Sequence, residues 1–339
     1  MSSAVVVLGC AAANPMRIRS MPFKRRSVHG GHMNGFGSRA RRRLHEVGNP
    51  VVVGIDPHLH RLPMALQSRF DGRLHTAEGR REAAAAISDW ALPVVEALAD
   101  QVWGIKPQAA FFEQLGGAGV AALERVVETA REAGLMVVLD AKRGDISSTA
   151  AAYAQATLHP HGPMAADSVT VNPWMGMDTL QPFLSVARDH ARGVFALLRT
   201  TNPGSALFQN YGEPRCADRL ADAIAEENAR DPGHSLGVVV GAQAAAEAPA
   251  LRERMPRAWF LVPGLGAQGG GVSDALAGAD AQGACVLPAA ARSILFGSSD
   301  TPDPGTEWVA PIMARADALV LQVVAHGRAR GWSAYRSPA

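Results

Sequence analysis

The residues best suited to chemistry lie in the segment 140–145, Asp-Ala-Lys-Arg-Gly-Asp, which directly follows the apolar run 135–139. If that run is a strand, its two-residue period places Asp140 and Lys142 on one face, with Asp145 in the loop beyond. A surface salt bridge is the alternative interpretation, but exposed pairs stabilise little and need no apolar strand to direct them. The pattern therefore favours a site that positions charge for catalysis.

Short β-rich apolar runs alternate with longer alanine-rich amphipathic segments from residue 51 onward. This alternation predicts an α/β fold, a single-domain (β/α)8 TIM barrel, and the span from 51 to about 330 suits its usual size of about 250 residues. A doubly wound open sheet is the alternative fold. The expected strands are 51–56, 102–106, 136–140, 168–172, 194–199, 236–240, 258–262 and 284–287, and the expected helices include 81–99, 120–133, 149–158, 179–191, 217–229 and 244–254.

In such a barrel, functional groups lie at the carboxyl ends of the strands. Lys106 ends the second expected strand and joins Asp140, Lys142 and Asp145 in a set of four alternating charges. Burial of these groups is costly unless each charge is paired, so the set should keep both lysines cationic and both carboxylates ionised. A rigid ammonium between carboxylates can protonate a carbanion as it forms, without a metal.

A glycine-rich loop, residues 263–271, follows the seventh expected strand, and Arg292 follows the eighth. Glycines let backbone N–H groups approach an anion closely, and barrels commonly bind phosphate with these two loops. Arg292 adds charged donors to the same place. Each signal is weak alone, but together they favour a phosphorylated substrate.

Composition restricts the class of protein further. The 339 residues are 47% hydrophobic and 19% charged, as expected of a globular protein with a large core. Residues 1–32 carry five basic side chains and no acidic one, which leaves 28 basic against 31 acidic side chains in the remainder. This mildly acidic body gives no electrostatic case for nucleic acid as a partner.

Cysteine usage and hydropathy indicate a soluble cytoplasmic protein. Cys10, Cys216 and Cys285 are widely separated and form no metal-type or redox-type pair, which fits a reducing cytoplasm. No apolar run approaches the roughly 20 residues of a membrane-spanning helix, so no membrane association is expected.

The N-terminal segment 1–32 is expected to be a disordered extension, because it is rich in Arg, Ser, Gly and His without apolar periodicity. An export signal at 4–10 is disfavoured, since no basic segment precedes it and its apolar core is short. Our hypothesis is that Met33 is the natural initiator and that residues 33–339 form the barrel domain.

The motifs together resemble the orotidine 5′-phosphate decarboxylase family, specifically its bacterial, mycobacterial-type (type 2) subgroup. The matching pieces occur in family order between residues 54 and 294. They are 54–57 (Gly-Ile-Asp-Pro), 106–113, 140–149, 171–173, the Pro-Gly loop at 203–204, 266–270 and 292–294.

This resemblance implies decarboxylation of orotidine 5′-phosphate to UMP and CO2, the last step of pyrimidine synthesis, without cofactor or metal. It implies that Lys142 protonates C6 of the developing carbanion and that Asp140 lies beside the departing carboxylate. Lys106 would hold Asp140 and a ribose hydroxyl, and Asp56 would bind the ribose.

The resemblance also implies the remaining substrate contacts and a partner. Thr201 would contact the pyrimidine ring. Asp145 and Thr149 would reach across a two-fold interface into the neighbouring site, which implies a homodimer with shared active sites. The expected phosphate ligands are Gln268, Gly269, Gly270 and Arg292.

Two alternatives stay open. The nearer is a sugar-phosphate aldolase or β-keto acid decarboxylase of the same barrel superfamily, which works through a magnesium-bound enediolate and has an acidic ligand on strand two, where this chain has Lys106. The farther is a non-catalytic nucleotide-binding sensor. The histidine pairs 58/60 and 159/161 lack carboxylates at helical spacing and are interpreted as ordinary loop residues.

Overall fold

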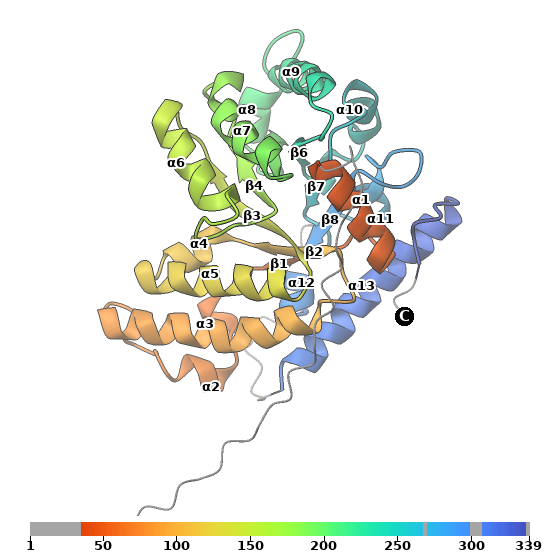
Figure 1. The fold of residues 1–339 in the computed structure, drawn as a ribbon. Coiled ribbons are helices and arrows are strands. Elements are labelled where there is room, and N and C mark those ends of the chain that lie inside the picture. Colours follow the sequence, from red (N-terminus) through yellow and green to blue (C-terminus); the bar gives the residue numbers. More distant parts are fainter. Residues whose placement is uncertain (1–34, 267–269, 299–306, 337–339) are drawn as a thin grey trace, which may run out of the picture. The chain divides into compact units, whose positions relative to one another are not determined.

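The structure is a computed structural model and describes residues 35–266, 270–298 and 307–336. Eight parallel strands close into a barrel in the order β1 to β8, with helices around it (Figure 1). The TIM-barrel prediction is therefore confirmed, and the open sheet is excluded. The strands are β1 (Val52–Ile55), β2 (Gly104–Pro107), β3 (Met136–Arg143), β4 (Ser168–Val171), β5 (Gly193–Arg199), β6 (Leu236–Val240), β7 (Phe260–Pro263) and β8 (Val286–Ala290).

The helices follow the strands as the alternating pattern predicts. Those expected from the sequence correspond to α3 (Ala77–Ala97), α5 (Gly117–Glu132), α6 (Ser147–Leu158), α7 (Gln181–Asp189), α9 (Cys216–Arg230) and α10 (Ala248–Arg254). Further helices are α1 (Phe36–Val47), α2 (Met64–Gln67), α4 (Ala109–Glu113), α8 (Ser205–Gln209), α11 (Val272–Leu276), α12 (Arg292–Leu295) and α13 (Val309–Ala329), with 3-10 turns at Leu59–Arg61, Met177–Leu180 and Ala242–Ala244.

The third strand is longer than predicted. The sequence places its end at Asp140, whereas β3 continues to Arg143. Its pairing with β4 shifts register between Leu139 and Arg143 and resumes where Arg143 lies opposite Val171. A bulge of this kind bends a strand and redirects its side chains. The apolar run 135–139 contains no information on pairing with β4, so the sequence alone did not predict that β3 continues to Arg143.

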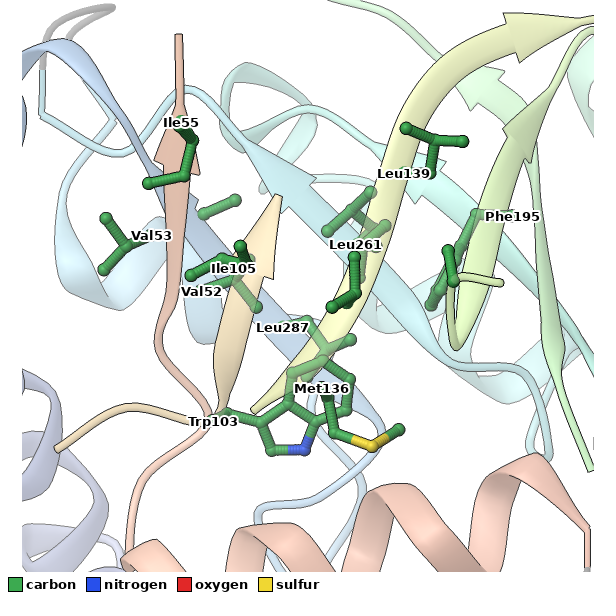
Figure 2. Packing of buried hydrophobic residues seen from close by; sticks show 14 of the residues in the cluster. Val52, Val53, Ile55, Trp103, Ile105, Met136, Leu139, Phe195, Leu261 and Leu287 are labelled. Atoms are coloured by element: carbon green, nitrogen blue, oxygen red, sulfur yellow. The ribbon is translucent and has the colours of Figure 1, made fainter. Parts of the chain in front are cut away.

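The barrel interior is filled by apolar side chains from several strands, and Figure 2 shows part of this packing. At the amino ends of the strands, α1 packs across the barrel. Phe36 makes edge-to-face contacts with Phe195 and Trp259, and the indole of Trp103 donates to the Ala40 carbonyl at 3.0 Å. Helix α1 thus covers the amino ends of the strands, and the carboxyl ends stay available for a functional site.

No apolar segment as long as a membrane-spanning helix was expected from the sequence. In the described part of the chain, however, helix α13 is long and apolar enough to cross a membrane by length and composition alone. Its buried residues Ile312, Ala316, Val320 and Val323 recur every three or four positions, and the helix packs against α3, α11 and α12. This periodicity is typical of an amphipathic helix that lies on a barrel. The segment 1–32 and the proposed start at Met33 lie outside the described residues.

Candidate active site

A cavity of about 260 Å³ lies at the carboxyl ends of the strands, and its two walls differ in chemistry. Strands β1 to β4 and the residues that follow them supply the polar wall: Asp56, Lys106, Gln108, Asp140, Lys142 and Thr170. The later strands and the residues after them supply an apolar wall and a polar rim: Leu197, Val239, Leu261, Pro263, Leu265 and Ala289–Ala291, with Thr200, Thr201 and Arg292.

The Asp140 carboxylate is the centre of the polar wall. Its Oδ1 accepts hydrogen bonds from Lys142 Nζ at 2.6 Å and from the Thr170 hydroxyl at 2.9 Å. Its Oδ2 accepts from Lys106 Nζ and from Gln108 Nε2, both at 3.0 Å. Two ammonium groups and two neutral donors therefore fix both oxygens of one buried carboxylate.

The charges of this cluster determine its protonation state. Burial alone would raise the pKa of Asp140, but Lys106 and Lys142 outweigh it and hold that pKa well below its usual range. Burial alone would lower the pKa of Lys106, whereas Asp140 and Asp56 raise it above its ordinary value. Lys106 is therefore cationic and Asp140 ionised at neutral pH, as the sequence predicts for these two members.

Lys142 lies in an unusual backbone conformation for a side chain of its size. Its φ of 48° falls in the left-handed region, directly in the bulge of β3. Such a conformation is unfavourable for a non-glycine residue and concentrates at functional sites. The bulge keeps Lys142 and Asp140 on the same side of the strand, where a regular strand of period two would also place them.

The other predicted substrate ligands are partly brought to this cavity. Asp56, Thr201 and Arg292 line it, and Asp56 Oδ1 is buried without a hydrogen-bond partner among the described residues. Gly270 is paired with Leu265 beside β7, outside the cavity lining. The predicted ligands Gln268 and Gly269 lie outside the described residues.

Asp145 and Thr149 are not brought into the cavity of their own chain. Asp145 Oδ1 accepts from the Ile146 backbone N–H at 2.8 Å, just before α6, and Thr149 is exposed in the first turn of that helix. The array within this chain therefore has three charged members, Lys106, Asp140 and Lys142, rather than four.

Two contacts of the site were missed by the sequence reasoning: Gln108 and Thr170. Gln108 follows Lys106 by two residues, so the period of a strand places both on one face. Thr170 lies inside the apolar run 168–171 and has the same spacing from Ser168. The signal that could have identified both as site residues was a polar side chain at an inward-facing position near the end of a strand.

Among the residues described, no group of three or more His, Cys, Asp or Glu side chains is arranged to hold a metal ion. On β2, where the magnesium-dependent alternative needs an acidic ligand, Lys106 stands instead, with its ammonium 3.0 Å from Asp140. The donor set at this position therefore suits an anion better than a cation.

Fold and site define a TIM-barrel enzyme that holds an ammonium beside a buried carboxylate. The profile of the family described as "Orotidine 5'-phosphate decarboxylase / HUMPS family" matches residues 49–301. The chain belongs to this family.

Curated relatives agree with this assignment. The orotidine 5'-phosphate decarboxylase of Rhodopirellula baltica is 38% identical over 275 residues, which cover 78% of this chain and 89% of the relative. That of Streptomyces coelicolor is 41% identical over 247 residues, covering 71% and 83%. The actinobacterial relatives fit the mycobacterial-type subgroup that the motifs predict.

A solved structure is similar as well. The crystal structure of a putative orotidine 5'-phosphate decarboxylase from Streptomyces avermitilis is 32% identical, with a TM-score of 0.69. The match covers 90% of this chain and 99% of that one.

Proposed function

We propose that this chain decarboxylates orotidine 5′-phosphate to UMP and CO2, the final step of UMP biosynthesis, with Lys142 as the proton donor. The observation that carries the proposal is the Asp140 carboxylate held between two ammonium groups, in a cavity that Arg292 also lines. Family membership supplies the substrate, and the charge array supplies a way to accommodate the anion that decarboxylation produces.

The reaction needs few steps on these residues. The bond between C6 and the carboxyl carbon breaks, CO2 departs, and the electron pair stays at C6. The Lys142 ammonium stabilises this charge and transfers a proton to C6, after which solvent returns a proton to the amine. Asp140 lies beside the departing carboxylate and, with Lys106, fixes the position of Lys142. No step draws on a cofactor.

The remaining cavity residues bind the substrate away from C6. Lys106 and Asp56, whose Oδ1 has no hydrogen-bond partner in the described part of the chain, bind ribose hydroxyl groups, and Thr201 contacts the pyrimidine ring. Arg292, together with the loop containing Gln268, Gly269 and Gly270, binds the phosphate.

Arg292→Ala is expected to raise KM for orotidine 5′-phosphate by about 10- to 100-fold, since a lost charged hydrogen bond costs about 1.5–3 kcal/mol. Steady-state kinetics checks this. Arg254→Ala is the matched control, because its exposed pair with Asp222 lies on α10 and α9 outside the cavity lining. An unchanged KM for Arg292→Ala would remove Arg292 from the phosphate site.

A homodimer with shared sites is the second part of the proposal. Asp145 and Thr149 lie outside their own cavity, and the nearby apolar side chains of Ile146 and Tyr153 are exposed. Trp174 and Phe208, which are 73% and 54% exposed, contact each other edge to face. The other exposed large apolar side chains in the segment 174–211 are Met175, Leu207 and Tyr211. Exposed apolar surface of this kind is typical of an interface.

Mixing inactive Lys142→Ala and Asp145→Ala subunits is expected to restore up to about a quarter of the wild-type activity per subunit. In a hybrid dimer one of the two sites receives an intact Lys142 and an intact partner Asp145. Activity after mixing, with subunit exchange followed by native mass spectrometry, checks this. Exchange without any recovery would contradict shared sites.

The cytoplasm is the proposed location. The exposed Cys216 and the buried Cys285 are both free thiols, and both fit a reducing compartment.

The substrate assignment is tested by incubating the purified chain with orotidine 5′-phosphate and separating the products by chromatography. UMP and CO2 in equal amounts are expected. Binding of UMP without any turnover would instead support the nucleotide sensor, and cleavage of a β-keto sugar phosphate would support the alternative enzyme class.

A further inference from the structure

One buried hydroxyl connects the two catalytic residues of β3. The Thr170 hydroxyl, on β4, donates to Asp140 Oδ1 and accepts from the Lys142 backbone N–H, both at 2.9 Å. Thr170 is completely buried, although its side chain lines the cavity. A single oxygen atom thus contacts both the carboxylate and the backbone that carries the proton donor.

The register of the sheet explains why a side chain takes this place. Between Leu139 and Arg143 the pairing of β3 with β4 is interrupted, and the ladder resumes at Arg143 opposite Val171. The Lys142 N–H lies in this gap, so a backbone partner is replaced by the Thr170 hydroxyl. A buried N–H without a partner is costly, and the left-handed backbone of Lys142 adds to that cost.

We infer that Thr170 is a positioning residue for decarboxylation, which holds the Lys142 turn and the Asp140 carboxylate in one fixed arrangement. This inference rests on the proposed function. Thr170 acts through Asp140 and Lys142, while the ribose and phosphate are bound by other residues. Its loss should therefore lower kcat and leave the affinity for UMP, which lacks the departing carboxylate, nearly unchanged.

The other neutral donor differs in an informative way. The Gln108 side chain donates to Oδ2, the oxygen that also accepts from Lys106, and among the described residues it has no hydrogen bond to the Lys142 turn. Thr170 is the residue that ties the proton donor itself to the carboxylate.

The test uses two matched pairs of variants in the full chain. Thr170→Val replaces the hydroxyl by a methyl group, and Thr170→Ala differs from Thr170→Ser by one oxygen atom. We expect kcat to fall by about 10- to 100-fold in the Val and Ala variants, the loss of a hydrogen bond to a charged group, and to stay within about threefold of wild type in Thr170→Ser.

Ser168→Ala is the control on the same strand. Ser168 is completely buried, two residues from Thr170, and its hydroxyl has no partner among the described residues. We expect kcat within about twofold of wild type.

Four measurements separate positioning from a loss of structure. Melting temperature and UMP affinity are measured beside kcat and KM for every variant. A lower kcat with nearly unchanged UMP affinity in Thr170→Val and Thr170→Ala supports the inference. If Thr170→Val does not fold, the comparison of Thr170→Ala with Thr170→Ser decides. Unchanged kcat in Thr170→Ala, or a parallel loss of UMP affinity, would overturn it. An inactive wild-type protein would instead contradict the proposed function.

Discussion

Replacement of Lys142 by alanine is expected to lower kcat by about 10³-fold or more, because general acid catalysis alone contributes about 10²- to 10⁴-fold. The ammonium of Lys142 lies 2.6 Å from Asp140 Oδ1, and the Lys142 side chain is 45% exposed and lines the cavity, so a bound substrate can reach it. Decarboxylation leaves an electron pair at C6, and Lys142 is the cavity ammonium assigned to protonate it. Steady-state kinetics on the purified variant measures the loss.

Lys142→Arg separates the two roles of the ammonium. Arginine keeps a positive charge beside Asp140 but does not lose its proton at any practical pH. If proton transfer is required, this variant stays nearly as inactive as Lys142→Ala. UMP affinity within a few-fold of wild type serves as the control for folding. Substantial activity of Lys142→Arg would show that charge, without proton transfer from this residue, is sufficient.

Asp140→Asn is expected to abolish turnover and also to lower the free energy of unfolding by about 3–5 kcal/mol, because it leaves a buried ammonium without its partner. The side chains of Lys106 and Asp140 are only 7% and 9% exposed. Urea denaturation at neutral pH checks the stability. Glu113→Gln is the control: it removes an exposed pair with Arg143, and a loss below about 1 kcal/mol is expected.

The pH dependence of stability follows from the same pair. The pKa of Asp140 is lowered by folding, so its contribution is present above the unfolded-state value of about 3.9 and is lost as the pH falls toward the folded-state value. The pKa of Lys106 is raised, so its contribution is present below about 10.4 and is lost at higher pH. Asp140→Asn should therefore lose less stability on acidification than the wild type. An equal acid dependence of both proteins would contradict the role given to Asp140.

The barrel and the centre of its site were predictable from the sequence because both depend on local patterns. Apolar runs define strands, and the barrel brings their carboxyl ends together, so Lys106, Asp140 and Lys142 had to converge. Asp56, Thr201 and Arg292 line the cavity for the same reason.

What the sequence did not predict depends on pairing between strands. The bulge of β3 and the left-handed backbone at Lys142 arise from the register with β4, which no pattern within 136–143 contains. Thr170 acquires its contacts only through that register. The position of Asp145 and Thr149 outside the cavity of their own chain was expected only from the family resemblance, because no local pattern in the sequence places them there.

The central claim is that this charge array removes the carboxyl group of orotidine 5′-phosphate without a metal. The most direct measurement follows the loss of orotidine 5′-phosphate absorbance with the purified wild-type chain in excess EDTA, beside Lys142→Ala. Full wild-type turnover in EDTA, and turnover lowered by about 10³-fold or more in the variant, is the predicted result. Wild-type activity that EDTA abolishes and magnesium restores would contradict the claim.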